Sequence, residues 1–249
     1  MSEKIIHLII ERQDSPDKEP YTDEFKVPYR PNMNVIGALM EIQKNPVNVK
    51  GETVAPVVWE MNCLEEVCGA CSMVINGKAM QACSTLVDKL QQPIRLKPMR
   101  TFPVIRDLMI DRSRMFEALK RVKAWIPIDG TYDLGPGPRM PERTRQWAYE
   151  LSKCMTCGVC LEVCPNVNSR SSFIGAQPIS QARLFNTHPT GEMNKEERLE
   201  ALMGDGGAPD CGNSQNCVEA CPKGIPLTTS IADINRQITL YSFKKFFVN

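Results

Sequence analysis

Two runs of cysteines in the second half of the chain have a spacing that could hold metal clusters. Residues 154–165 read C-x2-C-x2-C-x3-C-P, and residues 211–222 have the same frame except that Ser214 stands where the second cysteine would be. Runs with this spacing bind iron–sulfur clusters, and the fourth cysteine, which precedes proline, binds a different cluster from the first three. The two runs are therefore predicted to be pseudo-symmetric halves of one site that holds two clusters.

Exchange of the fourth cysteine between the runs, as in two-cluster bacterial ferredoxins, divides the thiols into two sets. The predicted sets are Cys154, Cys157, Cys160 and Cys221 around one cluster, and Cys164, Cys211 and Cys217 around the other. A serine hydroxyl rarely replaces a thiolate, because its pKa is far above the thiol value of about 8.5. We therefore expect [4Fe–4S] in the first set and [3Fe–4S] in the second. A four-iron cluster with water or hydroxide on the iron beside Ser214 remains the alternative.

A third group of cysteines, in the first half of the chain, has the spacing C-x4-C-x2-C…C that is typical of plant-type [2Fe–2S] sites. Its members are Cys63, Cys68, Cys71 and Cys83. Gly69 suits a loop that turns its backbone N–H groups toward the cluster sulfurs, because glycine tolerates unusual dihedral angles. Zinc would prefer two separated C-x2-C pairs in a tetrahedral set, which these patterns do not provide.

The residues before the [2Fe–2S] motif predict two strands and one helix. Residues 4–12 and 22–27 are rich in β-forming side chains and are expected to pair as strands. Apolar residues recur at helical spacing across residues 35–42, and Asn34 is a suitable N-cap. Strand, strand and helix in this order begin a β-grasp domain.

The residues after the motif predict a hairpin that returns Cys83 to the cysteine loop. Asn76-Gly77 favours a type I′ turn between strands at residues 73–75 and 78–81. A last strand at residues 94–96 is expected to close the sheet.

After about Pro103 the pattern changes from β-rich to helical, and we place a domain boundary between residues 103 and 104. The expected helical faces are Val104, Leu108 and Met109, then Phe116, Leu119 and Val122, the segments 180–185 and 195–203, and Ile231, Ile234 and Ile238 after Pro226. Residues 134–141 predict a Pro/Gly loop, and Pro141 is expected to begin a helix through Trp147 and Leu151 that leads to Cys154. The predicted fold class is α+β, with a β-grasp plant-type [2Fe–2S] ferredoxin domain in residues 1–103 and an all-α bacterial-type ferredoxin domain in residues 104–249.

Composition and charge exclude several classes of function. The 249 residues include 30 basic and 29 acidic side chains, so no overall field favours nucleic acid or an anionic surface. The cysteines number 11, which is odd, and no signal-like leader precedes residues 5–10, so reduced, metal-bound thiols are expected rather than a secreted disulfide scaffold. No apolar run approaches the roughly 18 residues that span a bilayer. His7 and His188 are predicted to be structural, and no catalytic constellation is found.

The order of these motifs resembles the iron–sulfur subunit of succinate dehydrogenase and fumarate reductase, over nearly the whole chain. Lys223-Gly224 after the second Cys-Pro is also typical of that family. The resemblance implies an electron path from the FAD of a separate flavoprotein through [2Fe–2S], [4Fe–4S] and [3Fe–4S] to quinone, with the cysteines named above as ligands. It implies no dicarboxylate site and no catalytic acid or base in this chain.

The resemblance also implies peripheral attachment to the cytoplasmic face of a bacterial plasma membrane, through an anchor subunit. Ubiquinone-reducing relatives carry tryptophans shortly after the first Cys-Pro and a histidine after the first cysteine of the second run, whereas this chain has residues 166–169, N-V-N-S, and Gly212. It is therefore more similar to menaquinone-linked members, whose anchor is a diheme cytochrome b. The aromatic and basic tail at residues 243–247 is a candidate for docking, with an ordinary packed C-terminus as the alternative.

Three alternatives remain open on the sequence alone. The same subunit could serve a fumarate reductase, because ligand spacing does not set the direction of electron flow. A free ferredoxin-like carrier would not need so large a helical domain. An electron-transfer subunit of another dehydrogenase would lack the N-terminal ferredoxin domain or carry further cysteine-rich repeats.

An electron path that begins at succinate requires a [2Fe–2S] potential far above the roughly −400 mV of plant-type ferredoxins. Backbone N–H groups at Gly69 and Ala70, together with the Ser72 hydroxyl, are expected to donate to sulfur and raise the potential. Glu65 and Glu66 would oppose this effect unless they point to solvent.

Overall fold

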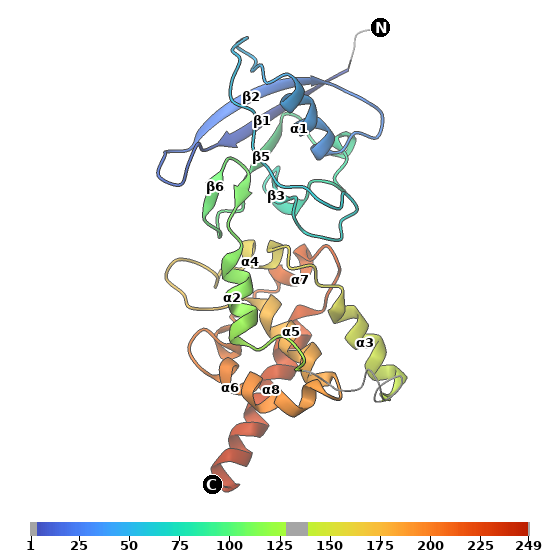
Figure 1. Ribbon diagram of the computed structural model, residues 1–249, viewed down its shortest axis with the longest axis vertical. Helices are drawn as coiled ribbons and strands as arrows, with labels where there is room; N and C mark the ends of the chain where they lie inside the picture. Colours follow the sequence, from blue (N-terminus) through green and yellow to red (C-terminus); the bar gives the residue numbers. More distant parts are fainter. Residues whose placement is uncertain (1–3, 128–138, 249) are drawn as a thin grey trace. The chain divides into compact units, whose positions relative to one another are not determined.

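The computed structural model describes residues 4–127 and 139–248 (Figure 1). It contains two compact units, of which the first comprises residues 1–112 and 155–162 and the second comprises residues 113–154 and 163–249. The segment 155–162, which carries Cys157 and Cys160, thus belongs to the same unit as the N-terminal residues. The domain boundary expected between residues 103 and 104 stays a prediction.

A five-stranded mixed sheet is the framework of the first unit (Figure 1). Its strands are β1 (Ile5–Arg12), β2 (Tyr21–Pro28), β3 (Ser72–Ile75), β4 (Lys78–Gln81) and β5 (Ile94–Lys97), in the order β2-β1-β5-β3-β4. β1 and β5 are parallel, and the other neighbouring pairs are antiparallel. The expected strands are confirmed, and the strand expected to close the sheet, β5, lies at its centre between β1 and β3.

The core of this unit lies between the sheet and α1 (Val35–Lys44). In β1, Ile6, Leu8 and Ile10 alternate with more exposed residues and are fully buried. Full burial of each such side chain stabilises the fold by about 1.5–3 kcal/mol. The Asn34 side chain accepts a hydrogen bond from Gly37 N at 2.8 Å, so the predicted N-cap is confirmed.

The predicted type I′ hairpin between β3 and β4 is also confirmed. Asn76 and Gly77 both have positive φ, at 47° and 82°, as this turn requires. The Asn76 side chain in addition accepts from Arg95 N at 2.7 Å and donates to Gln91 O at 2.8 Å. The turn is thereby fixed to β5, which holds the strand that leads to Cys83 in register.

The helix expected around Val104, Leu108 and Met109 is wrong. These residues belong instead to a short hairpin, β6 (Val104–Arg106) and β7 (Met109–Ile110), whose turn has Asp107 at φ 47°. The apolar spacing of this segment matches a helix, but its conformation is set by a contact with residues far away in the sequence.

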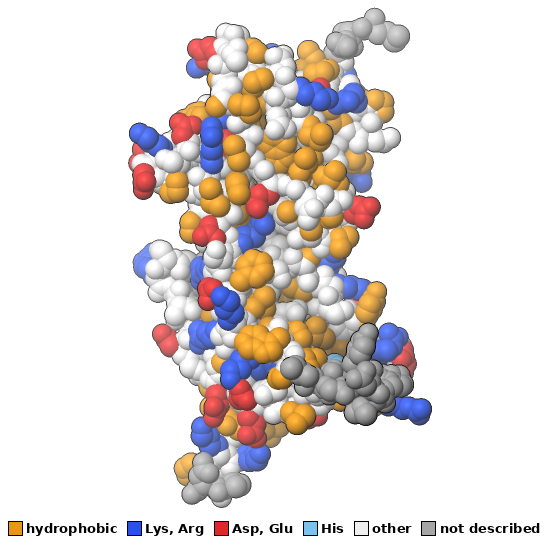
Figure 2. Space-filling view, in the orientation of Figure 1, with side chains coloured by type: hydrophobic (Ala, Val, Ile, Leu, Met, Phe, Trp, Pro, Cys, Tyr) orange, Lys and Arg blue, Asp and Glu red, His pale blue; other side chains and the backbone are white. Residues whose placement is uncertain are grey.

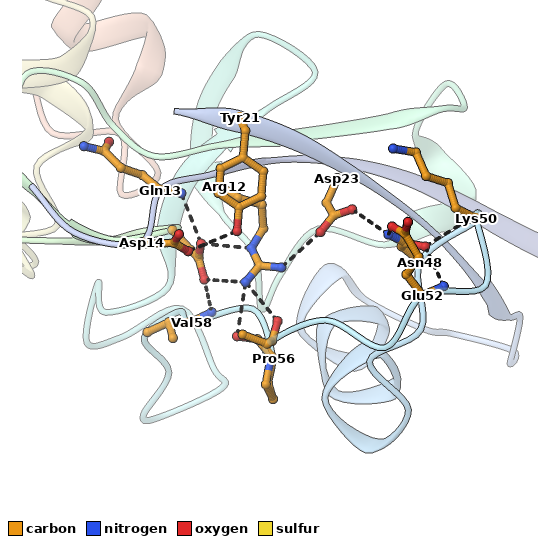
Figure 3. A network of polar contacts seen from close by, with 12 residues as sticks. Arg12, Gln13, Asp14, Tyr21, Asp23, Asn48, Lys50, Glu52, Pro56 and Val58 are labelled. Carbon is orange, nitrogen blue, oxygen red and sulfur yellow. Dashed lines mark hydrogen bonds and ion pairs between the residues drawn. The ribbon is translucent and has the colours of Figure 1, made fainter. Parts of the chain in front are cut away.

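That contact is a buried ion pair between Arg12 and Asp107. Both side chains are fully buried, and Arg12 Nε donates to Asp107 Oδ1 at 2.9 Å. Figure 3 shows the Arg12 guanidinium directed also toward Asp23 and the carbonyl of Pro56, at 3.3 and 3.4 Å. The Asp107 carboxylate accepts further bonds from Gln13 N and Val58 N. A buried charge pair is tolerated when its donors and acceptors are satisfied in this way.

Every regular element described in the second unit is a helix. They are α2 (Ser113–Arg121), α3 (Glu142–Ser152), α5 (Ala176–Thr187), η2 (Gly191–Asn194), α6 (Lys195–Met203), η3 (Ala208–Asp210), α7 (Asn216–Ala220) and α8 (Leu227–Val248). The first unit also holds the short helices η1 (Val87–Lys89) and α4 (Val159–Glu162). The helices expected in residues 116–122, 180–185 and 195–203 and after Pro226 are therefore confirmed. Pro141 precedes α3 as its N-cap residue, and the expected Pro/Gly loop falls largely in residues 128–138, outside the described residues.

Helices α5 and α8 pack together in the second unit (Figure 1). Arg183 Nε donates to Asp233 Oδ2 at 3.1 Å, and the hydroxyls of Ser180 and Ser230 are 3.3 Å apart in the buried contact. The apolar face of α8 that was predicted from its isoleucines is buried as well. Among residues 4–127 and 139–248, no helix is both long enough and apolar enough to cross a bilayer.

Candidate iron–sulfur cluster sites

The Cys63 sulfur is surrounded by backbone donors from its own loop. Cys63 Sγ accepts from the N–H groups of Glu65, Val67 and Cys68 at 3.4, 3.3 and 3.3 Å. These bonds, led by that of Glu65, lower the pKa of Cys63 to about 7. Hydrogen bonds to the charged form favour that form, so the loop stabilises a thiolate before iron binds.

Left-handed residues give the loop this shape. Leu64, Glu66 and Gly69 have φ of 61°, 56° and 74°. Positive φ is uncommon for residues other than glycine, and successive turns of this kind gather N–H groups into an anion-binding concavity. The loop also directs Ala70 N to Cys68 Sγ at 3.4 Å. The sequence pointed to Gly69 and Ala70, whereas nothing in it marked Leu64.

The other two cysteines assigned to [2Fe–2S], Cys71 and Cys83, are buried. Cys83 N donates to Cys71 Sγ at 3.4 Å across the end of the β3–β4 hairpin. Burial, together with the neighbouring Cys83 thiol, raises the pKa of Cys71 to about 12. A buried thiol of this kind becomes a ligand when a positively charged iron replaces its proton. The site therefore combines an accessible thiol that ionises readily with a buried pair, a donor set that fits [2Fe–2S].

The Ser72 hydroxyl was expected to donate to a cluster sulfur, and that expectation is wrong for the contacts observed. Its Oγ lies 2.7 Å from Gly69 O and 3.1 Å from Gln81 Oε1. Ser72 therefore supports the loop from behind, by bonding to a main-chain carbonyl of the cysteine loop. Of the two glutamates expected to oppose a high potential, Glu65 is exposed and Glu66 accepts a hydrogen bond from Ser84 Oγ at 2.8 Å.

The three thiols assigned to the [3Fe–4S] cluster all lie in the second unit. Cys217 is buried on α7, and its pKa is raised by burial and by the charges of Cys164 and Cys211. Asn213 N donates to Cys211 Sγ at 3.4 Å, so one sulfur of this set also has a backbone donor.

The four thiols assigned to [4Fe–4S] are divided between the units. Cys157 and Cys160 belong to the first unit, and Cys154 and Cys221 belong to the second. Within the second unit, Ile225 N lies 3.5 Å from Cys221 Sγ as a donor. Convergence of these four cysteines on one cluster stays a prediction.

The backbone repeats between the two cysteine runs, with each counterpart 57 positions later. Cys157 stands between left-handed Thr156 (φ 51°) and Gly158 (φ 88°), and Ser214 stands between left-handed Asn213 (φ 53°) and Gln215 (φ 66°). The second ligand position of each run, Cys157 in the first and Ser214 in the second, thus lies between two left-handed residues.

The repeat continues into the short helix that follows each run's second position. Leu161 N bonds to Gly158 O at 3.0 Å at the start of α4, and Val218 N bonds to Gln215 O at 2.9 Å at the start of α7. The predicted pseudo-symmetry is therefore visible in the main chain as well as in the spacing of the cysteines. Ser214 itself is exposed.

Comparison with known proteins gives the same division of the chain into cluster-binding parts. One family model, a 2Fe-2S iron-sulfur cluster binding domain, matches residues 7–117, and another, a 4Fe-4S dicluster domain, matches residues 150–225. The chain is 74% identical to the succinate dehydrogenase iron-sulfur subunit of Bacillus subtilis (strain 168) over 248 residues, which are 99% of this chain and 98% of the relative. The chain belongs to the family of succinate dehydrogenase iron–sulfur subunits. It is the iron–sulfur electron-transfer subunit of a succinate dehydrogenase complex.

More distant relatives of this iron–sulfur subunit include fumarate reductases. The fumarate reductase iron-sulfur subunit of Wolinella succinogenes is 30% identical over 224 residues, which cover 88% of this chain and 90% of the relative. A chain of the Mycobacterium smegmatis Sdh1 complex in the apo form has a TM-score of 0.79 at 24% identity, over 97% of this chain and 98% of that chain. At this identity the likeness shows the fold. The predicted α+β fold, a β-grasp [2Fe–2S] domain before a helical dicluster domain, is confirmed.

The two histidines of the iron–sulfur subunit make structural contacts. His7 Nε2 lies 3.0 Å from Glu24 Oε2 across β1 and β2. His188 Nδ1 accepts from Thr190 N and Gly191 N, at 3.2 and 3.3 Å, where η2 begins. Both contacts are consistent with the structural role expected from the sequence.

Two residues near Cys164, Cys211 and Cys217, the three thiols assigned to [3Fe–4S], were not predicted from the sequence to support the site. The side chains of Asn166 and Asn216 both donate across the two cysteine runs, to Asp210 O and Val163 O. Asparagine next to a ligand position, as in N-C at residues 216–217, is the signal that could have found them, because its amide readily bonds to nearby carbonyls.

Proposed function

We propose that this iron–sulfur subunit receives electrons one at a time from the FAD of a flavoprotein subunit and passes them through [2Fe–2S], [4Fe–4S] and [3Fe–4S] to menaquinone. The proposed ligands are Cys63, Cys68, Cys71 and Cys83 for [2Fe–2S], Cys154, Cys157, Cys160 and Cys221 for [4Fe–4S], and Cys164, Cys211 and Cys217 for [3Fe–4S]. The chain supplies thiolates, backbone donors and spacing, and contributes no acid or base to the oxidation of succinate.

The observation that carries the [3Fe–4S] assignment is the conformation around Ser214. Left-handed neighbours hold Ser214 as Thr156 and Gly158 hold Cys157, so the second run is built to present a ligand at this position. A hydroxyl stands there instead of a thiol, while the other three positions of the set keep their cysteines. A site with three thiolates and one missing ligand supports a cluster of three irons.

Exposed apolar side chains support docking at both ends of the electron path. Leu64 and Val67 within the [2Fe–2S] loop and Met61 just before it have exposed fractions of 47%, 59% and 44%. Figure 2 shows hydrophobic side chains at the surface of the face in view. Exposed apolar groups of this kind mark contact surfaces, and we assign this one to the flavoprotein. We assign Phe243 and Phe246 near the end of α8 to an anchor subunit, a diheme cytochrome b, that holds the chain at the cytoplasmic face of the plasma membrane.

The assignment to menaquinone is supported by two residues at positions where ubiquinone-reducing relatives carry larger side chains. Asn166 follows the first Cys-Pro and Gly212 follows Cys211. A Cβ built on Gly212 would lie 3.0 Å from Asn166 Oδ1, so the two positions are in contact. These two positions therefore supply neither an aromatic ring nor an imidazole to a quinone site.

The test is an EPR-monitored redox titration of the purified complex with succinate and fumarate. We expect a [3Fe–4S] signal in the oxidised state, with [2Fe–2S] and [4Fe–4S] signals that appear on reduction. A protein with two four-iron clusters and no three-iron signal would contradict the ligand assignment. The same titration compares succinate oxidation with fumarate reduction. Fumarate reduction is the direction that the name of the Wolinella succinogenes relative suggests.

A further inference from the structure

Two asparagine side chains link the cysteine runs around the three-thiol set. Asn166 Nδ2 donates to Asp210 O at 2.7 Å, and Asn216 Nδ2 donates to Val163 O at 3.1 Å. The bonds join residues 44 and 53 positions apart in the sequence. They are therefore tertiary contacts, which the local conformation of either run does not produce.

Each bond begins and ends beside a proposed ligand. Asn166 lies two residues after Cys164, and its acceptor Asp210 immediately precedes Cys211. Asn216 immediately precedes Cys217, and its acceptor Val163 immediately precedes Cys164. The first bond thus fixes the distance between the Cys164 and Cys211 segments, and the second does the same for the Cys164 and Cys217 segments.

Gly212 leaves room for the Asn166 amide. A Cβ on Gly212 would lie 3.0 Å from Asn166 Oδ1 and 3.1 Å from its Nδ2. The backbone of Gly212 is not left-handed, so its conformation does not itself require glycine. The close approach of the amide is the feature that a larger residue would disturb.

We propose that Asn166 and Asn216 are positioning residues that hold Cys164, Cys211 and Cys217 in one preformed arrangement for the cluster. The proposal rests on the proposed function of these three thiols. Three thiolates held around one cluster repel one another, so the segments that carry them need contacts of their own to stay together. Cross-links outside the ligand shell fix the ligands and reduce the loss of conformational freedom when the cluster binds.

The experiment uses the assembled complex and follows loss of the three-iron EPR signal in the presence of an iron chelator. Asn166→Asp and Asn216→Asp keep the size of the side chain but replace the donor with a charged acceptor. Each variant is expected to lose the three-iron signal about two- to ten-fold faster than the wild type, the range for one hydrogen bond. The signal itself is expected to become broader. The [2Fe–2S] signal of the same sample is the internal reference and is expected to decay as in the wild type.

The matched control is Asn168→Asp, which adds the same charge near the same cluster. Asn168 Nδ2 donates to Pro165 O at 2.9 Å and its Oδ1 accepts from Arg170 N, so both bonds are local and neither reaches the second run. Cluster loss in this variant is expected to match the wild type. Equal rates for all three aspartate variants would show that charge, and not the cross-link, is responsible, and would overturn the proposal.

A second route breaks the first bond without altering Asn166. Gly212→Ala should displace the amide and speed cluster loss as Asn166→Ala does, and it should add little in the Asn166→Ala background, because both changes remove the same contact. Fully additive effects would overturn the role of this contact. If the wild-type site gave a four-iron signal, the [3Fe–4S] assignment would fail, and the same comparison made on that signal would still decide whether the asparagines position the ligands.

Discussion

Gly69 of the [2Fe–2S] loop lies directly against Cys157 of the first cysteine run. A Cβ built on Gly69 would be 2.7 Å from both the Cα and the Cβ of Cys157, and 3.1 Å from Met155 O. All three residues belong to the first unit. Because Gly69 follows Cys68, a proposed ligand of [2Fe–2S], and Cys157 is a proposed ligand of [4Fe–4S], the backbone of one cluster loop touches a ligand of the next.

The first prediction concerns this contact. Gly69→Ala should force the two loops apart and destabilise the first unit by about 2–4 kcal/mol, the sum expected for overpacking and for a side chain at positive φ. Gly77→Ala is the matched control, because Gly77 has φ 82° but nothing within 4 Å of its added Cβ, and it should cost only about 1 kcal/mol. Thermal loss of the [2Fe–2S] EPR signal measures the difference. Similar losses in both variants would show that the contact with Cys157 contributes little.

The second prediction concerns Ser214. Ser214→Cys should weaken or remove the three-iron EPR signal and produce a second four-iron cluster, because the flanking backbone already matches that around Cys157. Ser214→Ala should leave the three-iron signal unchanged, since the hydroxyl is not expected to bind iron. Loss of the signal in Ser214→Ala would mean that the serine is a ligand and that the missing-ligand explanation is wrong.

The third prediction concerns the buried pair of Arg12 and Asp107. Asp107→Asn leaves the fully buried Arg12 without its main counter-charge and should destabilise the first unit by about 3–5 kcal/mol. The double variant Arg12→Met, Asp107→Leu should recover part of this loss, because it removes both charges. Limited proteolysis between residues 98 and 112 would report release of the β6–β7 hairpin. A single variant as resistant as the wild type would show that the pair does not hold the hairpin.

The sequence predicted those features that depend on local pattern or on a fixed chemical spacing. The strand at residues 4–12, the Asn34 cap and the Asn76-Gly77 turn depend on local sequence, and the structure confirms them. The β6–β7 hairpin was mistaken for a helix because its conformation depends on the ion pair between Asp107 and Arg12, which are 95 positions apart in the sequence. The left-handed residues Leu64 and Gln215 have no sequence signal, because side chains of their types rarely adopt positive φ.

The last prediction concerns the potential of the [2Fe–2S] centre. Five backbone N–H groups point at sulfurs of the loop, three of them at Cys63 and one each at Cys68 and Cys71. Donors to cluster sulfur stabilise the reduced, more negative state and raise the potential above the plant-type value of roughly −400 mV.

Succinate should therefore reduce this centre in the assembled complex. Ala70→Pro removes the N–H that reaches Cys68 Sγ at 3.4 Å and should lower the potential by about 40 mV, if one hydrogen bond contributes about 1 kcal/mol to a one-electron couple. Ala70→Ser keeps the amide and should leave the potential near that of the wild type. EPR-monitored redox titration measures both variants. A wild-type centre that stays oxidised under excess succinate but is reduced by dithionite would show that these donors do not raise the potential far enough for electrons from succinate.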